Sequence, residues 1–196
     1  NRSNDVDYQY SQNPNFYYLT GFRDPDAVLI LFKDQKTFDE NKGVKELLFI
    51  RPKNKSEEIW TGIRPSCEEA SVITGIQSVY TTVQFKDFGI AFSKMEELWV
   101  EFPSQPNSEA FSKIALANLV EDFKQKLPAD LSIDEIKPIK VMALMREVKQ
   151  KEEIALVKRA VDISVEGFIE LMKAIKPGFK EYQAQAIVEY FVKNNG

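Results

Sequence analysis

The side chain whose type and surroundings best suit binding chemistry in this sequence is a tryptophan, Trp60. It follows the carboxylates of Glu57 and Glu58 and precedes an exit through Gly62, so its neighbours are too polar for an ordinary core residue. The flat apolar face of an indole matches the ring of a proline, and the edge of the indole can stay in water. The alternative is that Trp60 simply packs within its own domain.

Two charged residues are further candidates for binding. Asp5 follows Arg2 by three residues, and the pair is either an exposed ion pair worth under ~1 kcal/mol or a carboxylate available to a cationic group. Arg64 closes the segment that contains Trp60, and its alternative interpretation is an ordinary surface cation.

The residues that are missing exclude several kinds of catalytic site. Histidine is absent and Cys67 is the only cysteine, which excludes Ser-His-Asp triads, Cys-His pairs and histidine zinc motifs within this chain. We expect Cys67 to be a small buried or half-buried thiol. A metal site here could use carboxylates alone and would favour magnesium, calcium or manganese.

Composition excludes further classes of protein. The 196 residues carry a net charge of −4, with a pI near 5.1, which argues against a nucleic-acid partner. No apolar run approaches the roughly 18 residues of a membrane span. A lone cysteine fits a reducing compartment, so we expect a cytoplasmic protein. The sequence opens on polar and acidic residues, so we expect no signal peptide within it. The missing initial methionine suggests a trimmed start, which leaves open that a targeting segment was removed.

The elements that must position these residues follow from turn signals and periodicity. Residues 8–22 predict a short strand, a turn at Asn13-Pro14 and one aromatic helical turn that Gly21 ends. Strands are expected over residues 27–32, 46–51, 79–83 and 98–100, the first two as a hairpin, and helices over 66–75 and 108–127. This alternation indicates an α/β fold, with helices against a mixed sheet.

A second domain is expected to begin near Lys137-Pro138. The strand signal persists through residues 141–145 and then fades. A helical apolar stripe follows, and a further helix starts near Glu181. The stripe consists of Ile154, Val157, Val161, Val165, Phe168, Met172 and Ile175. Two long helices without a sheet to cover do not make a stable domain, so they indicate the opening of a larger one.

Several short motifs occur in a fixed order along most of the chain. They are Arg2 with Asp5, Tyr8-x-Tyr10-x-Gln12, residues 16–22, Asp24-Pro25, residues 58–64, Met145-Arg146 with Lys149, residues 152–155, Pro177-Gly178 and Glu181-Tyr182. In this order the chain resembles the aminopeptidase P family, with a creatinase/aminopeptidase P-type N-terminal domain over residues 1–140. Residues 141–196 are similar to the first helices of that family's pita-bread domain. Gln9, Ser11 and Pro14-Asn15 depart from the family pattern.

The resemblance implies a metal-dependent Xaa-Pro aminopeptidase that acts on peptides with proline in second position. It implies two Mn²⁺ ions in the whole enzyme, with ligands that follow Gly196, so no catalytic or metal-binding residue is expected in this chain. The chain alone is expected to be inactive. A homo-oligomer, dimer or tetramer, is implied, in which Asp5, Trp60 and Arg64 face the substrate of a neighbouring subunit.

Two alternatives remain beside this interpretation. A prolidase, which cleaves Xaa-Pro dipeptides, has a related N-terminal domain and the same pita-bread half. A non-catalytic pita-bread relative would instead bind peptides or histones. The sequence that follows Gly196 would discriminate between an enzyme and such a binding module.

Overall fold

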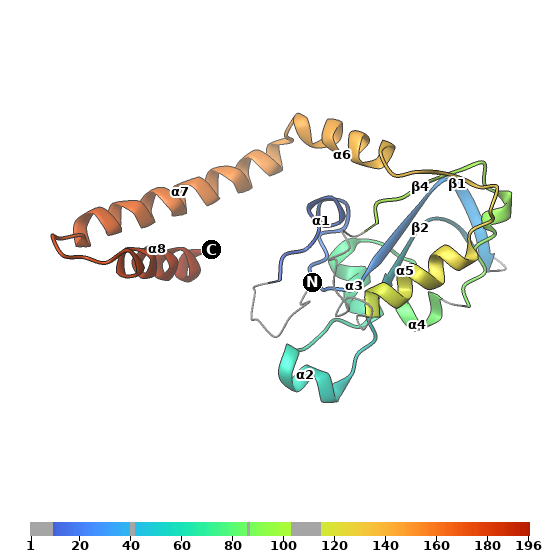
Figure 1. Ribbon diagram of the computed structural model, residues 1–196, viewed down its shortest axis with the longest axis horizontal. Coiled ribbons are helices and arrows are strands. Elements are labelled where there is room, and N and C mark those ends of the chain that lie inside the picture. Colours follow the sequence, from blue (N-terminus) through green and yellow to red (C-terminus); the bar gives the residue numbers. More distant parts are fainter. Residues whose placement is uncertain (1–9, 40–41, 86, 103–114) are drawn as a thin grey trace. The chain divides into compact units, whose positions relative to one another are not determined.

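The structure is a computed structural model that describes residues 10–39, 42–85, 87–102 and 115–196. The chain divides into two compact units, Asn1–Lys140 and Val141–Gly196 (Figure 1). Each unit has its own helices, and the first contains the sheet. Within the described residues, no helix combines the length and the apolar character needed to cross a membrane.

A three-stranded mixed sheet forms the centre of the first unit. Strands β1 (Val28–Asp39) and β2 (Lys42–Ile50) are antiparallel, with Val28 opposite Phe49. Strand β3 (Val79–Thr81) pairs with β2 in parallel, which gives the order β1-β2-β3. The α/β class, the mixed sheet and the β1–β2 hairpin predicted from the sequence are therefore confirmed.

Strand β2 is covered on both faces, and this produces two clusters of buried side chains. Because side chains alternate along a strand, Leu48 and Ile50 share one face while Leu47 and Phe49 share the other. The first pair packs with Phe22, Ala70 and Ile76, and the second with Phe85 and Leu119. Helices α3 (Cys67–Thr74) and α5 (Ala115–Lys126) thus contribute to opposite faces of the sheet.

Caps set the ends of two short helices. Asn13 accepts hydrogen bonds from the backbone N–H groups of residues 15 and 16 at the start of α1 (Pro14–Thr20), and Gly21 ends it with φ 66°. Ser66 and Glu69 form a capping box at the start of α3, and Gly75 ends it with φ 77°. The bounds of α3 and the end of α1 at Gly21 agree with the prediction, whereas α1 already begins at Pro14 and is longer than the single turn that was expected. Residues 10–13 form no strand, and the rest of the strand expected before α1 lies outside the described residues.

Other elements differ from the prediction. Residues 141–145, which carried a strand signal, lie in helix α6 (Lys137–Glu147), because methionine, alanine and leucine also favour helices. The predicted strand over residues 79–83 stops at Thr81 and continues as helix α4 (Thr82–Phe85). A single 3₁₀ turn, η1, covers Phe92–Lys94.

Two short elements were not predicted at all. Helix α2 spans Lys55–Thr61. Strand β5 (Ser132–Asp134) pairs in parallel with β4 (Glu97–Trp99) in a separate two-stranded sheet. Of the two, α2 carries Trp60, the first candidate for binding in the sequence.

The second unit contains two packed helices. Helix α7 (Lys151–Ala174) and helix α8 (Glu181–Asn195) lie side by side (Figure 1). Buried Gly167 of α7 lies against the ring of Phe191 of α8. The predicted apolar stripe is present on α7, yet its seven side chains are 51% to 67% exposed. The α8 contact therefore uses a different side of α7.

Candidate functional site around helix α2

Helix α2 directs acidic side chains inward and apolar side chains outward. Of its seven residues only Glu57 and Glu58 are half-buried, whereas Ile59 and Trp60 are 79% and 86% exposed. Ile63, just after the helix, is 89% exposed. An ordinary surface helix shows the opposite pattern. We call Ile59, Trp60 and Ile63 the α2 apolar surface.

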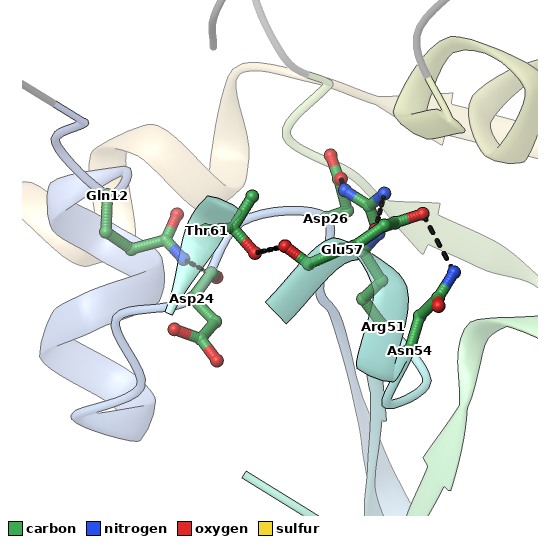
Figure 2. A network of polar contacts seen from close by, with 7 residues as sticks. All are labelled: Gln12, Asp24, Asp26, Arg51, Asn54, Glu57 and Thr61. Atoms are coloured by element: carbon green, nitrogen blue, oxygen red, sulfur yellow. Dashed lines mark hydrogen bonds and ion pairs between the residues drawn. The ribbon is translucent and has the colours of Figure 1, made fainter. Parts of the chain in front are cut away.

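Polar contacts, instead of apolar packing, hold α2 on its domain (Figure 2). Arg51, directly after β2, bonds through Nη2 to Oε2 of Glu57 at 2.6 Å and through Nη1 to Oδ2 of Asp26 at 3.2 Å. Asn54 caps the helix, since its Oδ1 accepts from the backbone N–H of Ser56 at 3.1 Å and its Nδ2 donates to Oε1 of Glu57 at 3.2 Å.

The other end of α2 is also closed by polar groups. The Thr61 hydroxyl donates to the carbonyl of Glu57 at 3.0 Å (Figure 2). Gly62 then leaves the helix with φ 85°, a conformation that favours glycine. The backbone N–H of Arg64 returns to Oε1 of Glu58 at 3.3 Å. Both inward carboxylates of the helix are thus occupied by hydrogen bonds.

The network extends to the loop between α1 and β1. Asp26 has the left-handed φ of 57° and a side chain that is only 11% exposed. The amide of Gln12 donates to the carbonyl of Asp24 at 2.8 Å (Figure 2). The same amide accepts from the hydroxyl of Tyr10 at 2.9 Å. Burial, with the nearby charges of Asp26 and Asp24, raises the pKa of Tyr10 to about 12.

Arg64 is inside the domain, so its interpretation as a surface cation is wrong. The residue is 8% exposed, and its Nη1 is buried without a hydrogen-bond partner among the described residues. Burial raises the pKa of Asp24, and the charge of Arg64 opposes that shift. The charge of Arg64 therefore favours the ionised form of the Asp24 carboxylate, and this attraction offsets part of the cost of burying the cation.

The three predicted binding residues have different outcomes. Trp60 is exposed, so packing within its own domain does not explain it. Arg64 is buried in the same segment. Asp5, with its proposed partner Arg2, lies outside the described residues. A substrate-binding role for these three residues stays a prediction.

Sequence reasoning missed the residues that connect α2 to its domain by ion pairs. In the sequence neither Arg51 nor Asp26 is a candidate, and Glu57 is only a neighbour of Trp60. The available signal was the order of residues 54–60, in which a capping asparagine and two glutamates precede an isoleucine and a tryptophan. Such an order places charge where a surface helix normally has its apolar face.

Cys67 is half-buried, as the sequence predicted. Burial, and secondarily the charge of Glu68, raises the pKa of its thiol above the ordinary value. The thiolate is the reactive form of cysteine, so these surroundings disfavour nucleophilic chemistry. No group of three or more histidine, cysteine, aspartate or glutamate side chains placed to hold a metal ion occurs among the described residues.

Comparison with known proteins agrees with this architecture. The family model for the aminopeptidase P N-terminal domain matches residues 1–99. The Xaa-Pro aminopeptidase of Escherichia coli is 29% identical over 206 residues, which cover 100% of this chain and 43% of that protein. The human Xaa-Pro aminopeptidase 3 is 28% identical, over 99% of this chain and 37% of that protein. The chain thus spans less than half the length of these relatives.

Solved structures of the same family share the fold. The aminopeptidase P of E. coli matches with a TM-score of 0.72 and 27% identity, over 100% of this chain and 43% of that one. The proline aminopeptidase P II of Yersinia pestis matches with a TM-score of 0.71 and 28% identity, over 100% of this chain and 44% of that one. Because the family model covers half of its residues, this chain belongs to the aminopeptidase P N-terminal domain family.

Proposed function

We propose that this chain is part of a cytoplasmic, metal-dependent Xaa-Pro aminopeptidase, which releases the N-terminal residue that precedes a proline. Its relatives carry the name Xaa-Pro aminopeptidase, which supports peptidase activity in the family. The observation that carries the role of this portion is the exposed indole of Trp60 on a helix held by polar contacts.

Trp60 is proposed to form one wall of the substrate pocket in a neighbouring subunit of a dimer or tetramer. An indole that is 86% exposed leaves most of its apolar face without a partner in its own chain. Proline presents a rigid, flat, apolar ring, which suits stacking on an indole face. Asp5 and Arg64 stay in the proposal as the residues that assist Trp60 from the same domain.

The second unit, with the domain boundary near residue 140, is proposed to begin the pita-bread catalytic domain. Its apolar stripe on α7 is more than half exposed, which supports a covering sheet supplied by later residues. Two Mn²⁺ ions belong to the proposal for the whole enzyme. The described residues offer no group of ligands that fits them, so the contribution proposed for this chain is a binding surface and subunit contacts.

The proposal is tested by incubating the full-length protein with Mn²⁺ and three peptides, followed by mass spectrometry. One peptide begins Xaa-Pro, a matched control begins Xaa-Ala, and the third is an Xaa-Pro dipeptide. We expect release of the first residue from the longer Xaa-Pro peptide, and none from the Xaa-Ala control. We also expect no release by the 196-residue chain alone.

Each other outcome contradicts part of the proposal. Cleavage of the dipeptide alone would make the protein a prolidase. An absence of cleavage with any peptide, in a protein that binds Xaa-Pro peptides, would favour the non-catalytic binding module. Activity of the 196-residue chain by itself would place catalytic groups within it and refute the assignment of this portion.

A further inference from the structure

We propose that Arg51 is a positioning residue, which holds helix α2 so that Trp60 faces outward. This inference rests on the proposed function, in which Trp60 contacts substrate in a neighbouring subunit. Arg51 itself is given no contact with substrate.

Helix α2 has little besides polar contacts to keep its orientation. None of its residues is fully buried, and its half-buried side is made of Glu57 and Glu58. Most helices in proteins are held by an apolar face against the core. A seven-residue helix without such a face is marginal by itself, so its orientation depends on the partners of its two carboxylates.

Arg51 joins two segments, helix α2 and the α1–β1 loop, through one guanidinium. Nη2 holds Glu57 of α2 at 2.6 Å, and Nη1 holds Asp26 of the α1–β1 loop at 3.2 Å (Figure 2). The planar fork of arginine can bind two carboxylates in a fixed relation, which a lysine ammonium does not reproduce. The side chain of Asp26 is only 11% exposed, so the domain encloses this end of the link.

The position of Trp60 depends on this link because Glu57 and Trp60 belong to the same short helix. With 3.6 residues per turn, Trp60 lies roughly 110° around the helix from the middle of the Glu57–Glu58 side, and Ile59 roughly 150°. A rotation or local unfolding of α2 therefore moves the indole. Without the guanidinium, the carboxylates of Glu57 and Asp26 lose the cation that they share, and repulsion favours such a movement.

The structural part is tested by hydrogen exchange on the full-length protein carrying Arg51→Met. The peptide covering residues 55–63 is expected to exchange about fivefold faster, the effect of losing a partly exposed ion-pair network. A peptide from α3 serves as the internal reference. Arg23→Met is the matched control, because Arg23 contacts Tyr17 of α1. Unchanged exchange over residues 55–63 would overturn the inference.

The functional part is tested by a double-mutant cycle with Trp60→Ala in the peptide assay. Arg51→Met is expected to raise KM for an Xaa-Pro peptide about fivefold, with kcat little changed, since stacking on an indole contributes mainly to binding. In the Trp60→Ala background the same change should have no further effect. An equal rise in KM in both backgrounds would overturn the inference.

Two more variants keep the outcomes distinct. Glu57→Gln retains the shape of the partner and should reproduce the direction of the Arg51→Met effect, while Arg51→Lys should restore only part of it. If Trp60→Ala alone leaves KM unchanged, the proposed wall of the pocket is refuted, and the kinetic half of this inference falls with it. The exchange measurement still decides by itself whether Arg51 holds α2.

Discussion

Replacement of Trp60 by alanine is expected to leave the free energy of unfolding almost unchanged, although it removes the largest type of side chain. With 86% of the residue exposed, only about a seventh of its surface is covered by the chain. A fully buried aromatic residue covers roughly 150–250 Å², so the covered part is about 30 Å². At about 25 cal/mol per Å², the loss is under ~1 kcal/mol.

The core residue Phe49 provides the contrast for this experiment. It is fully buried, and its ring packs edge-on against Phe85 at 5.0 Å and Phe88 at 5.2 Å between centroids. Phe49→Ala should therefore cost about 3–5 kcal/mol. Urea unfolding followed by far-ultraviolet circular dichroism compares both variants without depending on the tryptophan signal. A loss above ~2 kcal/mol for Trp60→Ala would show that the indole packs within its own chain.

Three further predictions concern the same unit. Ser66→Ala removes the N-cap of α3 and should cost about 1 kcal/mol in urea unfolding, and an unchanged midpoint would contradict the capping box. Tyr10, with its pKa raised to about 12 from 10.0, ionises more readily when unfolded, so stability should fall as pH rises from 10 toward 12. The Tyr10→Phe variant should show a smaller fall of the urea midpoint over this pH range. An identical fall would refute Tyr10 as the group responsible. A hydrogen bond from Lys53 and a second one from the backbone of Ser66 lower the pKa of Glu69 to about 2. The contribution of Glu69 to the free energy of unfolding should therefore be present above about pH 4.5 and lost toward pH 2. In the Glu69→Gln variant the free energy of unfolding should fall less between about pH 4.5 and pH 2. An unaltered fall would contradict the role given to Glu69.

Local signals in the sequence were sufficient for the elements with strong caps or apolar runs. Helix α1 lies between the caps Asn13 and Gly21, and α3 between the caps Ser66 and Gly75. An N-cap needs a side chain that accepts a hydrogen bond, and these C-caps need a positive φ, so both can be recognised in the sequence. The hairpin followed from its two apolar strands. Two short elements could not be predicted. Strand β5 has only three residues, and α2 has charged residues on its inward side in place of an apolar face.

The candidate site was predictable only in part. The polar surroundings of Trp60 left two interpretations open, a binding surface and packing within its own domain, and the structure leaves the residue 86% exposed. The burial of Arg64 could not be inferred, because it depends on how the residues after α2 pack in three dimensions. For the same reason, the link from Arg51 to Asp26 and Glu57 became visible only in three dimensions.

The most direct test of the proposed function is to measure which residues lie beside Trp60 in the assembled protein. A photoreactive residue, p-benzoylphenylalanine, replaces Trp60 in the full-length protein, which is then irradiated with and without an Xaa-Pro peptide. We predict a covalent dimer whose adduct maps to residues after Gly196 in the other copy, with less dimer when the peptide is present. Adducts found only within the same chain would contradict the proposed role of Trp60 in a neighbouring subunit.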